Sequence, residues 1–171
     1  MTKNLHPPFK ALAPEKMLQL NVEKHARALT ELWRTRGGHV YVQGATGTGK
    51  STVARMLATQ LKADWFSYER LSPAEFKAER DDIIARLAAS GKKVLILDGF
   101  FPQYAGGAFS TLLSERRDKG VSLFIFSQES PFPKDNALRE GGEFHPGAFE
   151  TIAEFRYGTR ARYPITFHQV K

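Results

Sequence analysis

Gly44-Ala45-Thr46-Gly47-Thr48-Gly49-Lys50-Ser51-Thr52 is the most informative run in this chain of 171 residues. Up to Ser51 it follows the pattern G-x-x-x-x-G-K-[ST] of a phosphate-binding loop, the Walker A motif. A β-rich run, 39–43, precedes it, and a segment with apolar residues at helical spacing, 51–61, follows it. Strand, glycine loop and helix in this order form the context in which the motif binds a nucleotide. The sequence therefore predicts a nucleotide-binding protein.

Each residue type in the loop has a chemical reason. The glycines let backbone N–H groups converge on phosphate oxygens without steric clash. The helix that begins near Lys50 directs the positive end of its dipole at the same anion. Lys50 adds a positive charge for the β- and γ-phosphates, and the Ser51 hydroxyl can ligate Mg²⁺. We therefore expect residues 44–52 to bind ATP, with Mg²⁺ as the accompanying metal.

Composition and charge narrow the class of protein further. The chain is 42% hydrophobic and 25% charged, as is ordinary for a soluble domain, and it has no cysteine for disulfides or thiolate chemistry. No apolar run approaches the roughly 20 residues that span a bilayer, and the N-terminus lacks a signal-peptide core. We therefore expect no membrane insertion and a cytoplasmic location. The net charge of +7 favours an anionic partner beyond the nucleotide, with simple solubility as the alternative.

The order of elements predicts an α/β fold. Residues 1–13 read as a flexible N-terminal arm and 14–171 as one domain. We expect strands over 39–43, 64–68, 94–98, 121–126 and 164–170, one or two helices over 15–36, further helices over 51–61, 72–89 and 106–117, and a short helix over 148–154. Alternating strands and helices predict a three-layer sandwich with a mostly parallel five-stranded sheet, which binds ligands at the carboxyl ends of its strands.

A carboxylate ends the apolar strand over 94–98. Asp98 has the place of the Walker B acid, which holds Mg²⁺ directly or through water. Gly99 follows it, where many ATPases of this architecture carry a glutamate that polarises the attacking water. Glu69, just past the second strand, is a candidate to supply that carboxylate, and a surface or helix-start role is the alternative. Glu129 is a poorer candidate.

Gln128 follows the apolar strand over 121–126. A polar side chain at the tip of such a strand, beside the phosphate loop, can contact the γ-phosphate or the attacking water, which is the sensor role. Capping of the following loop is the alternative.

The region from Phe109 to Gln128 resembles two groups of DNA-associated ATPases. It has a leucine pair, an arginine, a glycine, an apolar strand and a glutamine, a pattern similar to that of the FtsK/HerA-like motors. It also resembles the AAA+ replication initiators and helicase loaders of the DnaA, DnaC and IstB type, in which an asparagine, here Asn21, precedes the first strand. The resemblance implies the additional-strand class of P-loop ATPases, in which the fourth strand lies between the loop strand and the Walker B strand. Because the sequence ends at the strand over 164–170, we expect no AAA+ lid domain.

The resemblance also implies an arginine before the last strand, and Arg156 or Arg160 could fill that position. Together with Arg162 they lie in an aromatic-rich segment. One of them could act as an arginine finger on the γ-phosphate of a neighbouring subunit in a homo-oligomer. The aromatic residues between the arginines would also suit contact with a nucleic-acid backbone, and solubility is the third alternative.

The sequence leaves three functions open. The first is a weak or partner-activated ATPase that serves a DNA process, such as replication, plasmid transfer or translocation, with DNA or a DNA-processing protein as partner. The second is a small-molecule or nucleotide kinase, because residues 97–100 resemble the substrate-strand motif of adenylate kinase. In that family a proline and an arginine would follow Phe100 directly, whereas Phe101-Pro102 stand here. The third is a non-catalytic switch that binds ATP to control a partner.

Overall fold

A computed structural model describes residues 14–131, 148–155 and 165–168. Six strands form one sheet in the order β2-β3-β4-β1-β5-β6. The strands are β1 (Val40–Gly44), β2 (Asp64–Ser67), β3 (Val94–Asp98), β4 (Ser122–Ser127), β5 (Thr151–Phe155) and β6 (Ile165–His168). The helices are α2 (Pro14–Arg36), α3 (Lys50–Gln60), α4 (Pro73–Ala89) and α5 (Gly107–Asp118), with a short 3₁₀ helix, η1 (Pro102–Tyr104), after β3.

The five strands from β2 to β5 are mutually parallel, and β6 is antiparallel to β5. The predicted mostly parallel sheet is therefore confirmed, but it has six strands instead of five. The predicted last strand is the antiparallel edge strand β6, and β5 is the strand that the prediction lacked. The fourth strand lies between the loop strand and the Walker B strand, because Phe126 of β4 pairs with Val42 of β1 and with Asp98 of β3. This is the strand order that the resemblance implied.

The predicted short helix over 148–154 was wrong. Residues Thr151–Phe155 form β5, which pairs with β1 on one side and with β6 on the other. Four of its five residues are buried. A short apolar run that is buried on both faces has no alternating pattern, so periodicity alone does not separate it from a buried helical turn.

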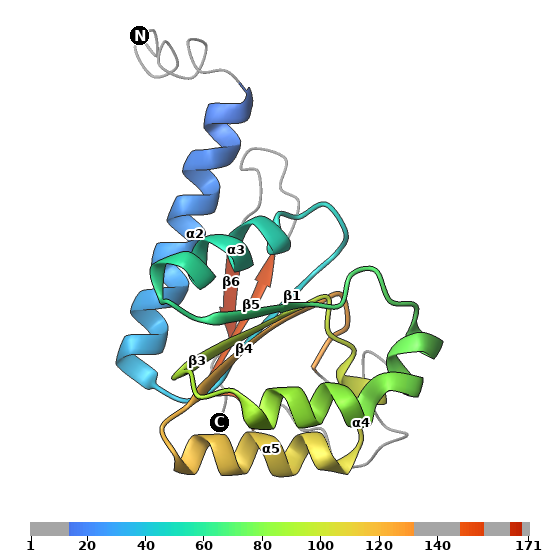
Figure 1. Ribbon diagram of the computed structural model, residues 1–171. Coiled ribbons are helices and arrows are strands. Elements are labelled where there is room, and N and C mark those ends of the chain that lie inside the picture. The colour runs from blue at the N-terminus through green and yellow to red at the C-terminus, as the bar shows by residue number, and fades with distance from the viewer. Residues whose placement is uncertain (1–13, 132–147, 156–164, 169–171) are drawn as a thin grey trace, which may run out of the picture.

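Helices cover both faces of the sheet, as Figure 1 shows. Successive strand residues point to opposite faces: Tyr41 packs with the α4 and α5 side, whereas Val40 and Val42 pack with the α2 and α3 side. The two resulting cores make the predicted three-layer sandwich. Within the described residues, the search for a helix long and apolar enough to cross a bilayer found none.

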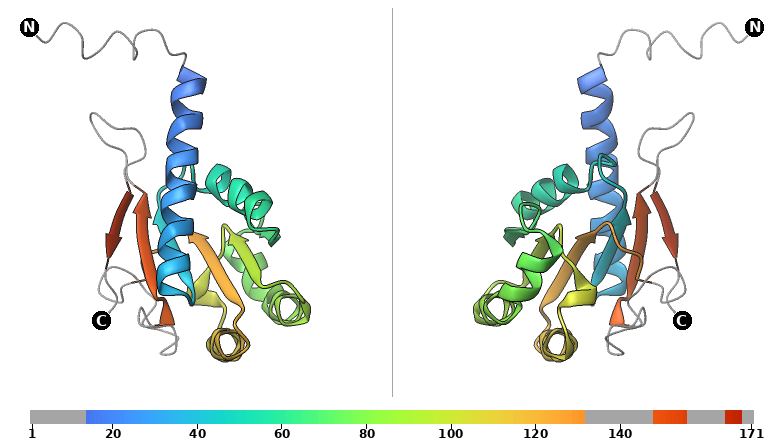
Figure 2. Two further views of the ribbon diagram at one scale, coloured as in Figure 1. Left: turned by 90° about the vertical axis from the view of Figure 1, so that its left-hand side faces the viewer. Right: turned by 90° about the vertical axis from the view of Figure 1, so that its right-hand side faces the viewer.

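Local signals in the sequence explain where two of the helices begin and end. At α4 the Ser72 side chain accepts from the Glu75 N–H at 3.2 Å, and the Glu75 carboxylate accepts from the Ser72 N–H at 2.7 Å. This reciprocal pair is a capping box, which explains why the helix predicted over 72–89 begins here. The single helix α2 ends before Gly37 and Gly38, which both have a φ of +67°. Its amino-terminal end projects beyond the sheet (Figure 2).

Candidate nucleotide-binding site

The phosphate loop connects β1 to the first residue of α3 and depends on its glycines. Gly47 and Gly49 have φ angles of +82° and +91°, in the left-handed region that suits glycine. A Cβ on Gly44 would lie 2.7 Å from Thr48 Oγ1, so the loop leaves no space for a side chain there. The Thr48 hydroxyl donates to the Ala45 carbonyl at 2.7 Å, which fixes the turn from inside.

Lys50 is folded over this loop. Its Nζ donates to the Ala45 carbonyl at 2.9 Å and also to the Gly44 carbonyl. Burial lowers the pKa of Lys50, while the nearby Asp98 and Glu69 charges raise it. The ammonium group therefore lies over the loop, in the position from which a P-loop lysine meets the β- and γ-phosphates.

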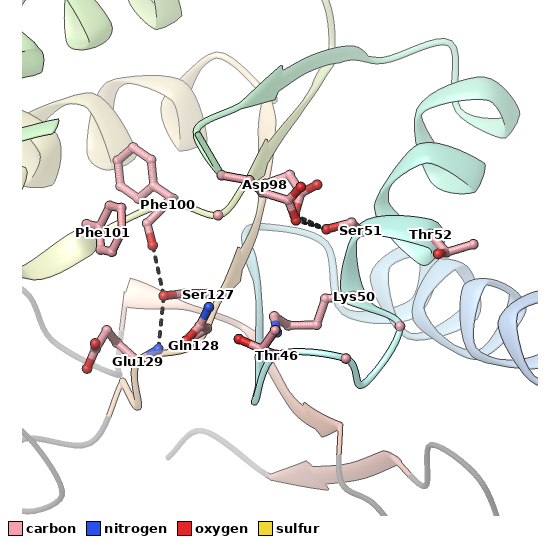
Figure 3. Close-up of a pocket in the computed structure, with 14 residues that line it drawn as sticks. Thr46, Lys50, Ser51, Thr52, Asp98, Phe100, Phe101, Ser127, Gln128 and Glu129 are labelled. Carbon is pink, nitrogen blue, oxygen red and sulfur yellow. Dashed lines mark hydrogen bonds between the residues drawn. The ribbon is translucent and has the colours of Figure 1, made fainter. Parts of the chain in front are cut away.

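Three oxygen-bearing side chains from three elements meet beside Lys50. The Ser51 hydroxyl on α3 lies 3.2 Å from Asp98 Oδ1 at the end of β3, and it also contacts Glu69 Oε1 past the end of β2. Figure 3 shows Asp98 and Ser51 directed at one another. Asp98 is only 1% exposed, and its Oδ2 has no hydrogen-bond partner. Burial, together with the Glu69 charge, raises the pKa of Asp98 to about 6.

Gly99 makes the approach of Glu69 sterically feasible. The Tyr68 N–H donates to the Asp98 carbonyl at 2.8 Å, which ties the end of β2 to the end of β3. A Cβ on Gly99 would lie 2.9 Å from the Glu69 backbone nitrogen and 2.9 Å from its Cγ. A larger residue at position 99 would therefore displace Glu69. The carboxylate of Glu69 can reach the phosphate loop because Gly99 has no side chain.

The end of β4 forms the opposite wall. The Ser127 hydroxyl donates to the Phe100 carbonyl at 2.8 Å and accepts from the Glu129 N–H at 3.1 Å (Figure 3). These bonds hold the strand end against the segment after β3. Gln128, between them, is exposed and lines the same cavity as Lys50.

The cavity has a volume of about 540 Å³, within the usual range for small-ligand sites. It brings together most of the predicted site residues and adds an aromatic wall that the sequence prediction missed. Its lining consists of Thr46, Gly47, Gly49, Lys50, Ser51, Thr52, Glu69, Asp98, Gly99, Phe100, Phe101, Ser127, Gln128 and Glu129. The signal for Phe101 was its place just past a strand-terminal acid, at the ligand edge of the sheet. Arg156 and Arg160 lie outside the described residues.

The chemistry of these side chains fits Mg²⁺. Ser51, Asp98 and Glu69 offer hard oxygen donors, which Mg²⁺ prefers, and the buried Asp98 Oδ2 has no hydrogen-bond partner. Of the three, Ser51 and Asp98 are the predicted metal ligands.

Strand order and loop together define the architecture of a P-loop ATPase of the additional-strand class. The chain matches no family model and no curated protein. It is similar in structure to a DNA replication initiation factor, with a TM-score of 0.54, 15% identity and coverage of 86% of this chain. It is also similar to the VirB11 ATPase of the Brucella suis type IV secretion system, with a TM-score of 0.51, 13% identity and coverage of 98%. The match spans 51% and 59% of those two chains, respectively. At sequence identities of 13% and 15%, the structural similarity shows the fold alone.

Proposed function

We propose that this protein is a Mg²⁺-dependent ATPase that turns over slowly alone and is accelerated by a partner in a DNA process. The observation that carries the proposal is that Lys50, Ser51 and Asp98 line one cavity at the ends of β1 and β3, with Gln128 just past the inserted strand β4. Such an arrangement suits a nucleoside triphosphate whose phosphates are bound by the loop and whose γ-phosphate faces the ends of β3 and β4.

Each side chain has a role in this proposal. Loop N–H groups and the amino end of α3 bind the phosphates, and Lys50 leaves the loop carbonyls to meet the β- and γ-phosphate oxygens. Ser51 and Asp98 hold Mg²⁺, which neutralises charge on the phosphates when bound. Gln128 contacts the γ-phosphate or the attacking water. Glu69 is the carboxylate that orients that water once its side chain leaves Ser51.

Slow turnover follows from position 99. Gly99 has no side chain that could orient water, and Glu69 contacts Ser51 instead of an approaching water. Poor positioning of a general base costs typically 10²–10⁴-fold in rate. A missing arginine finger costs 10³–10⁵-fold, and Arg156 or Arg160 could supply one only from an adjacent subunit. A partner that orders these groups would therefore raise the rate.

DNA, or a protein bound to it, is the proposed partner. The net charge of +7 supports an anionic polymer. The fold shared with a DNA replication initiation factor is consistent with this choice. We further propose that ATP or DNA promotes assembly of a homo-oligomer, and that the protein is cytoplasmic. The inserted β4 defines the additional-strand class, so it favours this ATPase over the kinase alternative.

The test is ATP turnover of the full chain with single-stranded DNA, with double-stranded DNA and without DNA, at several salt and protein concentrations. We expect DNA to raise turnover and the effect to fade as salt rises. A panel of small phosphate acceptors runs alongside, with Lys50→Ala as the inactive control. Fast turnover that is indifferent to DNA, salt and protein concentration would refute the proposal. A phosphorylated acceptor would point to a kinase, and ATP binding without turnover under every condition would point to a switch.

A further inference from the structure

One hydroxyl group faces two carboxylates at the mouth of the phosphate loop. The Ser51 hydroxyl lies within hydrogen-bonding distance of both Asp98 Oδ1 and Glu69 Oε1. A serine hydroxyl carries one proton and can donate it to one acceptor at a time. At any moment, therefore, either Asp98 Oδ1 or Glu69 Oε1 lies next to the Ser51 oxygen without a hydrogen bond from it. The negative charges of the two carboxylates also lie close together around Ser51.

A second, independent observation concerns the other oxygen of Asp98. Asp98 Oδ2 is buried and has no hydrogen-bond partner, although the side chain is directed into this group. Among the described residues, no lysine, arginine or histidine lies within ion-pair distance of Asp98 or Glu69. Lys50, the nearest cationic side chain in sequence to Ser51, is bonded to the carbonyls of Gly44 and Ala45. Lys50 and Arg55 attract the Asp98 charge only from beyond ion-pair distance. A buried carboxylate oxygen without a hydrogen bond is costly.

We propose that Ser51, Glu69 and Asp98 form a divalent-cation site that is loaded before the nucleotide arrives. Two carboxylates and a hydroxyl supply hard oxygen ligands of the kind that Mg²⁺ and Mn²⁺ prefer, and a cation among them would offset the repulsion between two carboxylates that form no direct ion pair among the described residues. The proposal rests on the proposed function for the identity of the nucleotide site, but it assigns Glu69 a new role. Glu69 is the ligand that makes the site independent of the nucleotide.

This role is compatible with orientation of water later in the cycle. Phosphate oxygens become available as ligands once ATP is bound. Glu69 is exposed and sits at the end of β2, so its side chain can leave Ser51 for the space before the γ-phosphate while its backbone stays next to Gly99. A single carboxylate thus serves first in cation binding and then in orienting water.

The experiment measures Mn²⁺ binding to the nucleotide-free full chain by electron paramagnetic resonance, with Mg²⁺ as competitor. We expect one Mn²⁺ per chain, with a dissociation constant on the order of 10⁻⁴–10⁻³ M. Glu69→Gln should weaken binding by about tenfold or more, because it removes one of two charged ligands. Glu129→Gln is the matched control, because it makes the same chemical change in the same cavity. Among the described contacts, Glu129 has none with Ser51 or Asp98, so this variant should bind Mn²⁺ like the wild type.

Binding of a fluorescent ATP analogue with excess Mg²⁺ runs in parallel and separates the two proposals. Mn²⁺ binding that is absent in the wild type, or equal in wild type and Glu69→Gln, overturns the cation site even where the analogue binds well. Mn²⁺ binding without analogue binding would support the cation site and refute the proposed function. Equal losses in Glu69→Gln and Glu129→Gln would show a general charge effect and would also overturn the site.

Discussion

Replacing Gly99 with alanine tests how Glu69 is held beside the phosphate loop. Gly99 has a φ of +69°, so an alanine must adopt the left-handed conformation, which costs roughly 1–2 kcal/mol. Its Cβ would also lie 2.9 Å from the Glu69 nitrogen and 3.1 Å from the Glu69 Cα. Backbone atoms cannot rotate away as a side chain can, and forced overpacking of this kind costs about 1–3 kcal/mol. The free energy of unfolding should therefore fall by about 2–5 kcal/mol.

Gly120→Ala is the matched control, because it separates strain from contact. Gly120 has a φ of +71°, but no atom lies within 4 Å of the position its Cβ would take. This variant should lose only the conformational term of roughly 1–2 kcal/mol. The difference between the two variants then measures the contact between Gly99 and Glu69.

Urea denaturation of the wild type and both variants gives the free energies, and ATP turnover gives the functional effect. Gly99→Ala should also lower turnover, because a displaced Glu69 backbone carries the carboxylate away from both the cation and the attacking water, whereas Gly120→Ala should not. Equal loss of stability in the two variants, with turnover unchanged in both, would refute the reasoning that Gly99 is required for the approach of Glu69.

Three further predictions concern the loop, the metal ligand and a buried histidine. Lys50→Ala should weaken Mg·ATP binding roughly 10–100-fold while leaving the fold intact, because it removes a charged hydrogen bond to phosphate; unchanged affinity in calorimetry would contradict nucleotide binding at this loop. Asp98→Asn should weaken ATP binding in a magnesium titration but leave binding in EDTA unchanged, and identical titrations would make Asp98 structural. Burial lowers the pKa of His25 to about 4, so its neutral form stabilises the fold above pH 6.5 and this contribution is lost as pH falls towards 4. Relative to His25→Leu, the wild type should lose up to about 3 kcal/mol over that range, and parallel pH profiles would exclude this role.

The phosphate loop and the strand-terminal acid could be predicted from the sequence because both are local signals. The glycine spacing up to Lys50 predicts the phosphate loop, and the apolar run that ends in Asp98 predicts the position of a carboxylate for Mg²⁺. The capping pair of Ser72 and Glu75 fixed the start of α4 in the same way. In each case the residues that determine the structure are close neighbours in the sequence.

Other features depended on contacts between distant segments. The strand character of Thr151–Phe155 comes from β1 and β6 on its two sides, which no local period encodes. The sequence left two roles open for Glu69, a carboxylate at the phosphate loop or a surface or helix-start residue. The close packing of its backbone on Gly99 brings it to Ser51. The wall formed by Phe101 depends on how the segment after β3 folds back along β4.

The strand order has a consequence for how the domain folds. β1, which presents the phosphate loop, has no partner nearby in the sequence: Val40 faces Phe124 on one side and Thr151 on the other. Such distant pairings must close long stretches of chain before any hydrogen bond compensates the lost entropy, which slows folding. At about 5–20 residues per second, a ribosome completes β5 roughly 5–20 s after the loop itself. We therefore expect the nucleotide-binding loop to be among the last parts of this domain to fold, although its residues lie in the first third of the chain.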